Sequence, residues 1–230
     1  MSNLAIIPAR GGSKRIPRKN IKNFLGKPII TYSIEAAIKS QLFDEIIVST
    51  DDEEIANVAI KCGANVPFFR SKKNSNDFAT TMDVIQEVRM KFISKNIQFN
   101  NICCIYPTAP LIKVEDLING YNLLVVERND LVYPVAKFSY PILRSLIIDE
   151  IGYLKMKWPE YAFTRSQDLP DVFHDSGQWY WYSDKSLSKN IFKKIKPIIL
   201  DSIQVQDIDD ESDFRIAEIK YQLLNNKLIL

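Results

Sequence analysis

Short apolar runs that alternate with amphipathic stretches are the feature that most constrains how this chain can fold. Residues 4–8 (LAIIP), 45–49 (EIIVS) and 101–106 (NICCIY) carry few polar side chains, which is typical of parallel strands buried on both faces. Helical patterns lie between and after these runs, over residues 32–39, 52–61, 80–93, 115–126 and 212–224. Val84, Ile85, Val88 and Phe92 fall on one face of the third helix.

This alternation predicts an α/β fold with a doubly wound, mostly parallel sheet, as in nucleotide-binding Rossmann-like domains. Ligands of such sheets bind at the carboxyl ends of the strands. With 230 residues, the chain is expected to form a single domain, 1–230, that carries one smaller added part. The final helix is predicted to bury Ile216, Ile219 and Leu223.

Segment 130–184 departs from the alternation. It is rich in Tyr, Phe, Trp and Pro and ends in a strand-like run, 178–182. We interpret it as an inserted β-rich extension. Exposed aromatic side chains need a partner surface, so the extension predicts a homodimer.

Composition excludes several classes of protein. The net charge of +2 does not provide the basic surface that nucleic-acid binding requires. No apolar run approaches the length of a membrane span, and the N-terminus lacks the pattern of a secretory signal. The three cysteines, of which Cys103 and Cys104 are adjacent, indicate a reducing compartment. A cytoplasmic protein is therefore expected, without a nucleic-acid or membrane partner.

The first predicted strand runs into a glycine pair and a dense cluster of cations, in residues 6–20 (IIPARGGSKRIPRKN). Gly11 and Gly12 allow a close backbone approach and positive φ, and their N–H groups suit an anion. The neighbouring cations are Arg10, Lys14, Arg15, Arg18 and Lys19. No Rossmann or P-loop motif is present, and a solvated basic loop is the alternative. Its place directly after a strand favours binding of a triphosphate.

Two acidic residues near the C-terminus suggest a metal site. Asp207 and Asp209 follow a strand-like run, 198–205, and flank Ile208. In an extended backbone their carboxylates share a face, where Mg²⁺ bound to a phosphate substrate would separate them. Alternatively the acids serve the last helix, with Asp210 or Ser212 as N-cap, and both roles can hold.

The basic loop resembles the N-terminal motif of the CMP-sugar synthetases, the cytidylyltransferases that activate sialic acid and related acidic sugars. Further stretches resemble later motifs of that family, in the same order along nearly the whole chain. They are VSTDDEEIA at 48–56, YPTAP at 106–110, RSQDLP at 165–170 and DID at 207–209.

The resemblance implies transfer of CMP from CTP to a nonulosonic acid, with release of pyrophosphate. It implies a nucleotide site made of Ala9, Arg10, Gly11, Gly12, Ser13, Lys14, Lys19, Asn20, Arg70, Thr80 and Thr81. Arg10, Lys19 and Asp209 are expected to act in catalysis, and Asp207 and Asp209 to bind Mg²⁺. The implied sugar site contains Tyr106, Thr108, Arg165, Gln167, His174 and Gln178.

Arg165 would clamp the sugar carboxylate with two hydrogen bonds, although a surface ion pair is the commoner role of an arginine. Tyr106 stands where the sialic-acid members have Gln, and the stretch FHDSGQWYW around His174 also departs from their pattern. These differences favour pseudaminic acid over N-acetylneuraminic acid. For His174, the alternative to sugar binding is a purely structural role. Residues 179–182 would form an apolar wall for the sugar, or else belong to the core or the dimer contact.

Other acceptors, namely legionaminic acid, N-acetylneuraminic acid or Kdo, are the nearest alternatives. A glycosyltransferase that consumes a nucleotide sugar is more remote, because its acidic metal motif typically lies mid-chain. A nucleotide-binding regulatory domain is the alternative that is not an enzyme.

Overall fold

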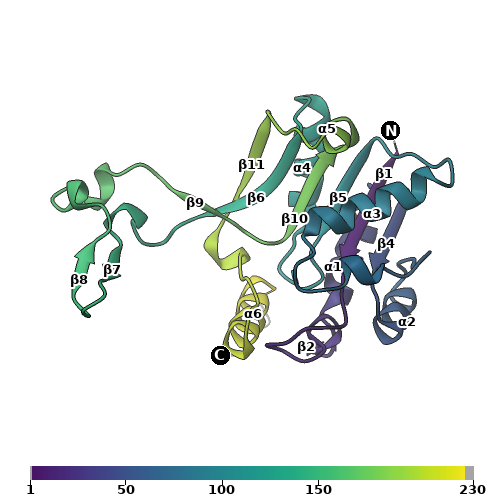
Figure 1. Cartoon of the computed structure of the whole chain (residues 1–230), viewed down its shortest axis with the longest axis horizontal. Helices are drawn as coiled ribbons and strands as arrows, with labels where there is room; N and C mark the ends of the chain where they lie inside the picture. Colours follow the sequence, from purple (N-terminus) through teal and green to yellow (C-terminus); the bar gives the residue numbers. More distant parts are fainter. Residues whose placement is uncertain (1, 226–230) are drawn as a thin grey trace.

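The computed structural model of the chain describes residues 2–225. It contains a central sheet covered by helices on both faces, from which a long arm extends (Figure 1). The strands are β1 Asn3–Pro8, β2 Asn23–Phe24, β3 Lys27–Pro28, β4 Glu45–Ser49, β5 Asn101–Ile105, β6 Leu131–Lys137, β7 Leu146–Ile148, β8 Leu154–Met156, β9 Phe173–Asp175, β10 Trp179–Ser183 and β11 Ile195–Leu200. The α-helices are α1 Ile30–Ser40, α2 Glu53–Lys61, α3 Thr81–Ile93, α4 Val114–Val126, α5 Asp184–Lys189 and α6 Glu211–Leu224.

The central sheet has the strand order β11-β6-β10-β5-β1-β4, and β9 pairs with β6. Strands β4, β1 and β5 pair in parallel, as do β6 and β11, whereas β10 runs antiparallel to both β5 and β6. The prediction of a mostly parallel sheet is confirmed. The antiparallel β10 lies beside β5 because it enters the sheet from the arm rather than from a crossover helix.

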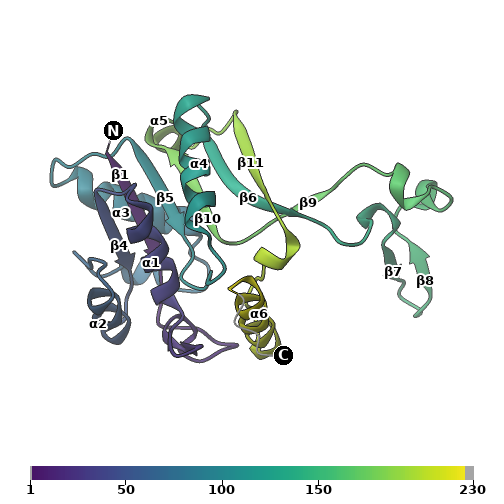
Figure 2. The same cartoon turned by 180° about the vertical axis from the view of Figure 1, so that it is seen from behind.

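Helices cover both faces, as a doubly wound sheet requires. Helices α1, α2 and α4 pack on the face that carries Ala5, Ile7 and Cys103. Helices α3 and α5 pack on the face that carries Ile6 and Cys104, and the view from behind shows the two layers (Figure 2). The adjacent cysteines point to opposite faces, because side chains alternate along a strand.

The helix predictions are confirmed to within two residues at each end, but the buried face of α6 is not the predicted one. Ile216, Ile219 and Leu223 are 40%, 52% and 45% exposed, whereas Phe214 and Ala217 are buried. Helix α6 packs through the narrow stripe that faces Phe24, Tyr32 and the β2–β3 hairpin. Its other apolar positions therefore face outward.

The predicted strand-like run 198–205 is also only partly correct. Strand β11 ends at Leu200, and a 3-10 turn, η6, follows over Ser202–Gln204. Asp201 stops the strand, because its carboxylate accepts a hydrogen bond from the Ile203 N–H and caps the turn.

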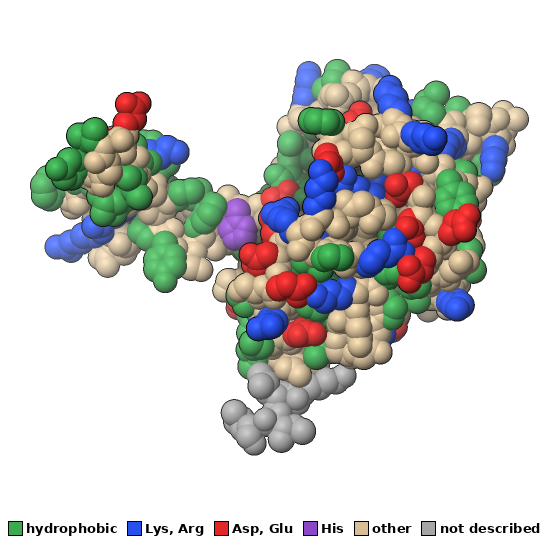
Figure 3. Space-filling view, turned by 60° about the horizontal axis from the view of Figure 1, so that its bottom comes forward, with side chains coloured by type: hydrophobic (Ala, Val, Ile, Leu, Met, Phe, Trp, Pro, Cys, Tyr) green, Lys and Arg blue, Asp and Glu red, His purple; other side chains and the backbone are tan. Residues whose placement is uncertain are grey.

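The arm comprises residues 138–172, between β6 and β9, and carries the small β7–β8 hairpin (Figure 1). The two ends of segment 130–184 are strands β6 and β10 of the central sheet, so the projecting part is shorter than that segment. Hydrophobic side chains gather on the arm (Figure 3). The most exposed are Tyr140, Ile148, Ile151, Tyr153, Leu154 and Phe163.

Two tryptophans of β10 fix helix α4 against the sheet. Trp179 and Trp181 are fully buried, and the Trp181 indole N–H donates to the Leu117 carbonyl over 3.1 Å. Gly120 of α4 lies directly above them. A Cβ at this position would lie 2.3 Å from Cη2 of Trp179, which is well inside van der Waals contact.

Gly120→Ala should therefore destabilise the protein, although alanine favours a helix by itself. Overpacking of this kind costs about 1–3 kcal/mol, which urea unfolding would measure. Gly12→Ala is the matched control for stability, because a Cβ there meets no atom within 4 Å. Equal stability of both variants and the wild type would show that α4 is not held in this way.

Candidate active site

A cavity of about 540 Å³ opens at the carboxyl ends of β1 and β5, where the sheet type predicts a ligand. The basic loop after β1, the YPT stretch after β5 and the N-terminus of α3 form its walls. Among the residues expected to bind nucleotide, sugar or metal, the cavity brings together Arg10, Ser13, Lys14, Lys19, Asn20, Arg70, Thr80, Thr81, Tyr106, Thr108 and Asp209.

The basic loop is held by the turn after β4, which belongs to the VSTDDEE stretch. The Gly11 N–H donates to Oδ1 of Asp51 over 2.9 Å, and the Ala9 N–H donates to the Ser49 carbonyl over 2.9 Å. A Cβ on Gly11 would lie 2.8 Å from Oδ2 of Asp52. Gly11 is thus required by the close approach of this turn and not by positive φ, which neither Gly11 nor Gly12 adopts. The sequence predicts that the Gly11 N–H binds an anion, but this N–H is already hydrogen-bonded within the protein.

Arg18, one of the five cations, also binds to the region that follows β4. Its guanidinium donates to both carboxylate oxygens of Asp52 and to Glu54. The hydrogen bond from Arg18 holds the pKa of Asp52 at about 2, and Asp52 also caps helix α2. Arg18 therefore anchors the loop and leaves ligand binding to its neighbours.

Arg10 and Lys14 face the cavity and share one counter-ion, Asp77. Nη1 of Arg10 lies 2.6 Å from Oδ1 of Asp77, and Lys14 pairs with the other carboxylate oxygen. The hydrogen bond from Lys14, followed by that from Arg10, lowers the pKa of Asp77. All three groups are well exposed, so a more highly charged anion can replace this carboxylate at small cost.

The basic loop meets the acidic residues from the other end of the chain. Nζ of Lys19 donates to the Ile208 carbonyl over 2.6 Å, and Nη2 of Arg15 lies 2.6 Å from Oδ1 of Asp209. Burial lowers the pKa of Lys19, and the charges of Asp209 and Asp207 oppose this shift. Residues 15–19 and 207–209 thus form one continuous charged wall.

Asp207 and Asp209 are close enough to repel each other. Burial raises the pKa of Asp207, and the charge of Asp209 raises it further. Neither caps α6, because Asp210 fills that position in a capping box with Asp213. Over residues 2–225, no cluster of three or more His, Cys, Asp or Glu side chains could by itself enclose a metal ion.

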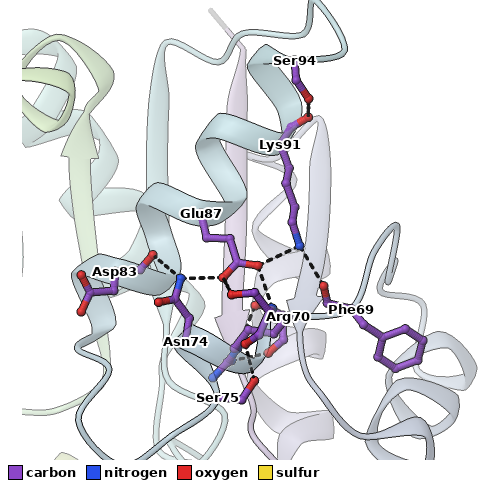
Figure 4. A network of polar contacts seen from close by, with 10 residues as sticks. Phe69, Arg70, Asn74, Ser75, Asp83, Glu87, Lys91 and Ser94 are labelled. Atoms are coloured by element: carbon purple, nitrogen blue, oxygen red, sulfur yellow. Dashed lines mark hydrogen bonds and ion pairs between the residues drawn. The ribbon is translucent and has the colours of Figure 1, made fainter.

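Arg70 is a buried cation that reaches the cavity from the loop before α3. Its Nε donates to Oγ of Ser49 over 3.1 Å, and Nη2 donates to the Ser49 carbonyl. Burial lowers its pKa. Glu87 holds the following residues against α3, through hydrogen bonds from Ser71 and Asn74 (Figure 4). This network keeps the Arg70 side chain at the cavity wall.

The residues expected to bind the sugar are divided between three places. Tyr106 and Thr108 line the cavity, and the Tyr106 hydroxyl lies 3.1 Å from Oγ1 of Thr81. His174 is on β9, where its Nδ1 contacts the Asp175 carbonyl and its ring packs on Phe138. Arg165 and Gln167 are exposed on the arm, at the 3-10 turn Ser166–Asp168.

Two groups expected at the sugar pocket lie elsewhere in this chain, and Trp179 and Trp181 take the core position given as the alternative for residues 179–182. Gln178 is buried, and its side chain donates to the Gln204 carbonyl instead of facing the cavity. Trp179 and Trp181 pack in the core under α4, so residues 179–182 provide no apolar wall. Only Tyr180 approaches the site, with its ring centroid 5.4 Å from that of Tyr106.

Comparisons with known proteins identify the family of this chain. Residues 4–133 match the model of a cytidylyltransferase family. The chain is 42% identical to the pseudaminic acid cytidylyltransferase of Campylobacter jejuni serotype O:2, over 97% of each protein. This chain belongs to the cytidylyltransferase family.

Other relatives of this cytidylyltransferase are named for other sugar acids. It is 32% identical to the CMP-N,N'-diacetyllegionaminic acid synthase of Legionella pneumophila, with full coverage of both chains. Its fold matches a solved structure of CMP:2-keto-3-deoxy-manno-octonic acid synthetase complexed with CTP. That match has a TM-score of 0.71 at 16% identity and covers 99% of this chain and 100% of the other. Within residues 2–225, no helix of the cytidylyltransferase is long and apolar enough to span a membrane.

The residues that hold the basic loop were not expected from the sequence. Asp51 and Asp52 were noted only as part of a motif, and Asp77 was not singled out. A local signal was present, because five cations within ten residues require nearby carboxylates. The sequence does not show which of the 28 acidic residues supply them, since those partners are 34 to 194 positions away.

Proposed function

We propose that this enzyme transfers CMP from CTP to the anomeric hydroxyl of pseudaminic acid, with release of pyrophosphate. The cavity supports the nucleotide half, because several cations and the Asp209 carboxylate line one pocket at the carboxyl ends of the strands, with Asp207 two residues away in the chain. The 42% identity with a pseudaminic acid cytidylyltransferase over 97% of the chain supports the sugar half.

The basic loop would neutralise the triphosphate. Arg10 and Lys14 would exchange Asp77 for phosphate oxygens, while Lys19, already fixed on the Ile208 carbonyl, would point its ammonium at the reacting phosphate. The anomeric oxygen forms a bond to the α-phosphorus as the bond to the bridging oxygen of pyrophosphate breaks. Such a displacement depends mainly on positioning and on neutralisation of charge.

Asp207 and Asp209 fit a magnesium ion that is shared with the nucleotide. Two carboxylates leave most positions of an octahedral ion open, and Mg²⁺ characteristically binds few protein oxygens together with phosphates and water. When bound, Mg²⁺ would stabilise negative charge on the phosphates. The protein contributes the two carboxylates, and Arg15 holds Asp209 in place until the ion arrives.

Lys19→Met and Asp209→Asn should each lower kcat by roughly 10²-fold or more while the fold persists, because each removes charge that stabilises the transition state. Pyrophosphate release gives the rates, and EDTA should stop the wild-type reaction until Mg²⁺ is added. Lys189→Met, at an exposed position in the last turn of α5, is the matched control and should keep full activity. Near-normal turnover in folded Lys19→Met or Asp209→Asn would remove that residue from the mechanism.

We also propose a homodimer that forms through the arm. The exposed apolar side chains of residues 138–172 need a partner surface, and Arg165 and Gln167 lie on the same arm. If Arg165 clamps the sugar carboxylate, it must act at the cavity of a partner chain, since its own cavity is not lined by the arm.

Ile148→Asp combined with Phe163→Asp should convert the dimer into a monomer, because both charges would have to be buried in the contact. Light scattering at micromolar concentration measures the mass, and activity should fall with it. Ile60→Asp is the control, since Ile60 is a comparably exposed residue on α2. A fully active wild-type monomer would rule out the dimer.

The choice of sugar is the decisive test of the proposed function. With pseudaminic, legionaminic and N-acetylneuraminic acids at equal concentration and limiting CTP, CMP-pseudaminic acid should dominate the products. A site built to pair with one set of substituents can reject another by roughly 10⁴-fold. A product pool dominated by CMP-N,N'-diacetyllegionaminic or CMP-N-acetylneuraminic acid would refute the assignment, and absence of pyrophosphate release would refute the whole reaction.

A further inference from the structure

Polar side chains from three places in the core form hydrogen bonds to the segment that leads into the acidic residues. This segment, residues 201–206, connects β11 to Asp207 and includes the turn η6. Gln178, which directly precedes β10, Asp116 of α4 and Lys220 of α6 all bond to it. None of these three side chains lines the cavity.

Gln178 connects the segment to the opposite wall of the site. Its side chain is 3% exposed, and its Nε2 donates to the Gln204 carbonyl over 2.5 Å. Its own carbonyl accepts the Tyr106 N–H over 2.8 Å. Gln178, directly before β10, is therefore bonded both to the wall that carries Tyr106 and to the segment that leads to the two acids.

Asp116 completes the attachment from helix α4. The Gln204 side chain is buried, and its Nε2 donates to Oδ2 of Asp116 over 3.1 Å. Val205, the next residue, is buried against Leu200 and Ala136. The last residue of the turn, Gln204, is thus hydrogen-bonded on two sides, three positions before Asp207.

The backbone around the two acids is also held by Asp213 of α6, which accepts from the Asp209 N–H, and by Gln206, which donates to the Asp207 carbonyl. Two further contacts are with cations that substrate would recruit. Lys19 bonds to the Ile208 carbonyl and Arg15 to Asp209, and both cations face a cavity proposed to receive a triphosphate. When these cations turn to phosphate, their hold on the acids weakens. Gln178 and Asp116 face away from the cavity, so their hold does not change when the nucleotide binds.

We infer that Gln178 and Asp116 are positioning residues, which through Gln204 set the separation and orientation of the Asp207 and Asp209 carboxylates. This inference rests on the proposed metal role of those two acids. It also changes the expectation for Gln178, from a contact with the sugar to a support for the metal site. Loss of hydrogen bonds made directly to the ligands typically costs 10- to 100-fold in metal affinity, and the indirect link through Gln204 is expected to act at the lower end of that range.

The test is the Kd for Mn²⁺ in the presence of CTP, measured by electron paramagnetic resonance on the whole chain. Gln178→Leu keeps the size of the side chain but removes the donor, and Asp116→Ala removes the acceptor. Both should raise the Kd for Mn²⁺ about tenfold or more, with the loss of kcat recovered at high Mg²⁺. Asp116→Asn retains an oxygen that can accept from Gln204, so it should stay within about twofold of the wild type.

A general loss of stability must be separated from this effect. Val88→Ala creates a cavity under α3, on the opposite face of the sheet, and should destabilise the fold without changing the Kd for Mn²⁺. If Gln178→Leu does not fold, the comparison of Asp116→Ala with Asp116→Asn carries the test.

Wild-type Mn²⁺ affinity in Gln178→Leu or Asp116→Ala would overturn the positioning role, as would an equal loss in Val88→Ala. The proposed function fails separately, if the wild type neither binds Mn²⁺ with CTP nor releases pyrophosphate.

Discussion

The site depends on the attraction between a basic loop near the N-terminus and an acidic loop near the C-terminus. Lys19 reaches the Ile208 carbonyl and Arg15 reaches Asp209, across 189 and 194 positions of sequence. Each loop alone concentrates charge of one sign, which is unfavourable for a compact structure. Joined in one wall of the cavity, they stabilise each other and present charges of both signs to the proposed nucleotide and metal.

The central sheet makes this meeting possible. Strand β1 lies between β4 and β5, so the basic loop emerges at its carboxyl end, between the turn that follows β4 and the YPT stretch that follows β5. Carboxylates from two different parts of the chain, the region after β4 and the loop before α3, give three of the cations different roles. Arg18 is bound to Asp52 and Glu54 and fixes the loop, whereas Arg10 and Lys14 share the exposed Asp77 and stay exchangeable.

Local patterns in the sequence were sufficient to predict the helices and strands of the core and most residues of the cavity. Buried strands and one-sided helices have short-range signatures, and the strand order of an α/β sheet then brings the loops together. The same reasoning failed where contacts with a distant part of the chain decide which side chains are buried. Helix α6 buries Phe214 and Ala217 rather than Ile216 and Ile219, because only one narrow side of it meets the β2–β3 hairpin. Gln178 was expected to face the sugar, but the turn after β11 packs over it. The roles of Arg165 and Gln167 depend on where a second chain would lie, which one sequence does not specify.

A crystal structure of the enzyme with CTP and Mn²⁺ would test most directly whether the two loops hold one substrate between them. Anomalous scattering should place the metal against the carboxylates of Asp207 and Asp209, with the triphosphate along Arg10, Lys14 and Lys19 and with Asp77 released from those cations. A nucleotide bound outside the cavity of about 540 Å³, or a metal distant from both aspartates, would contradict this arrangement.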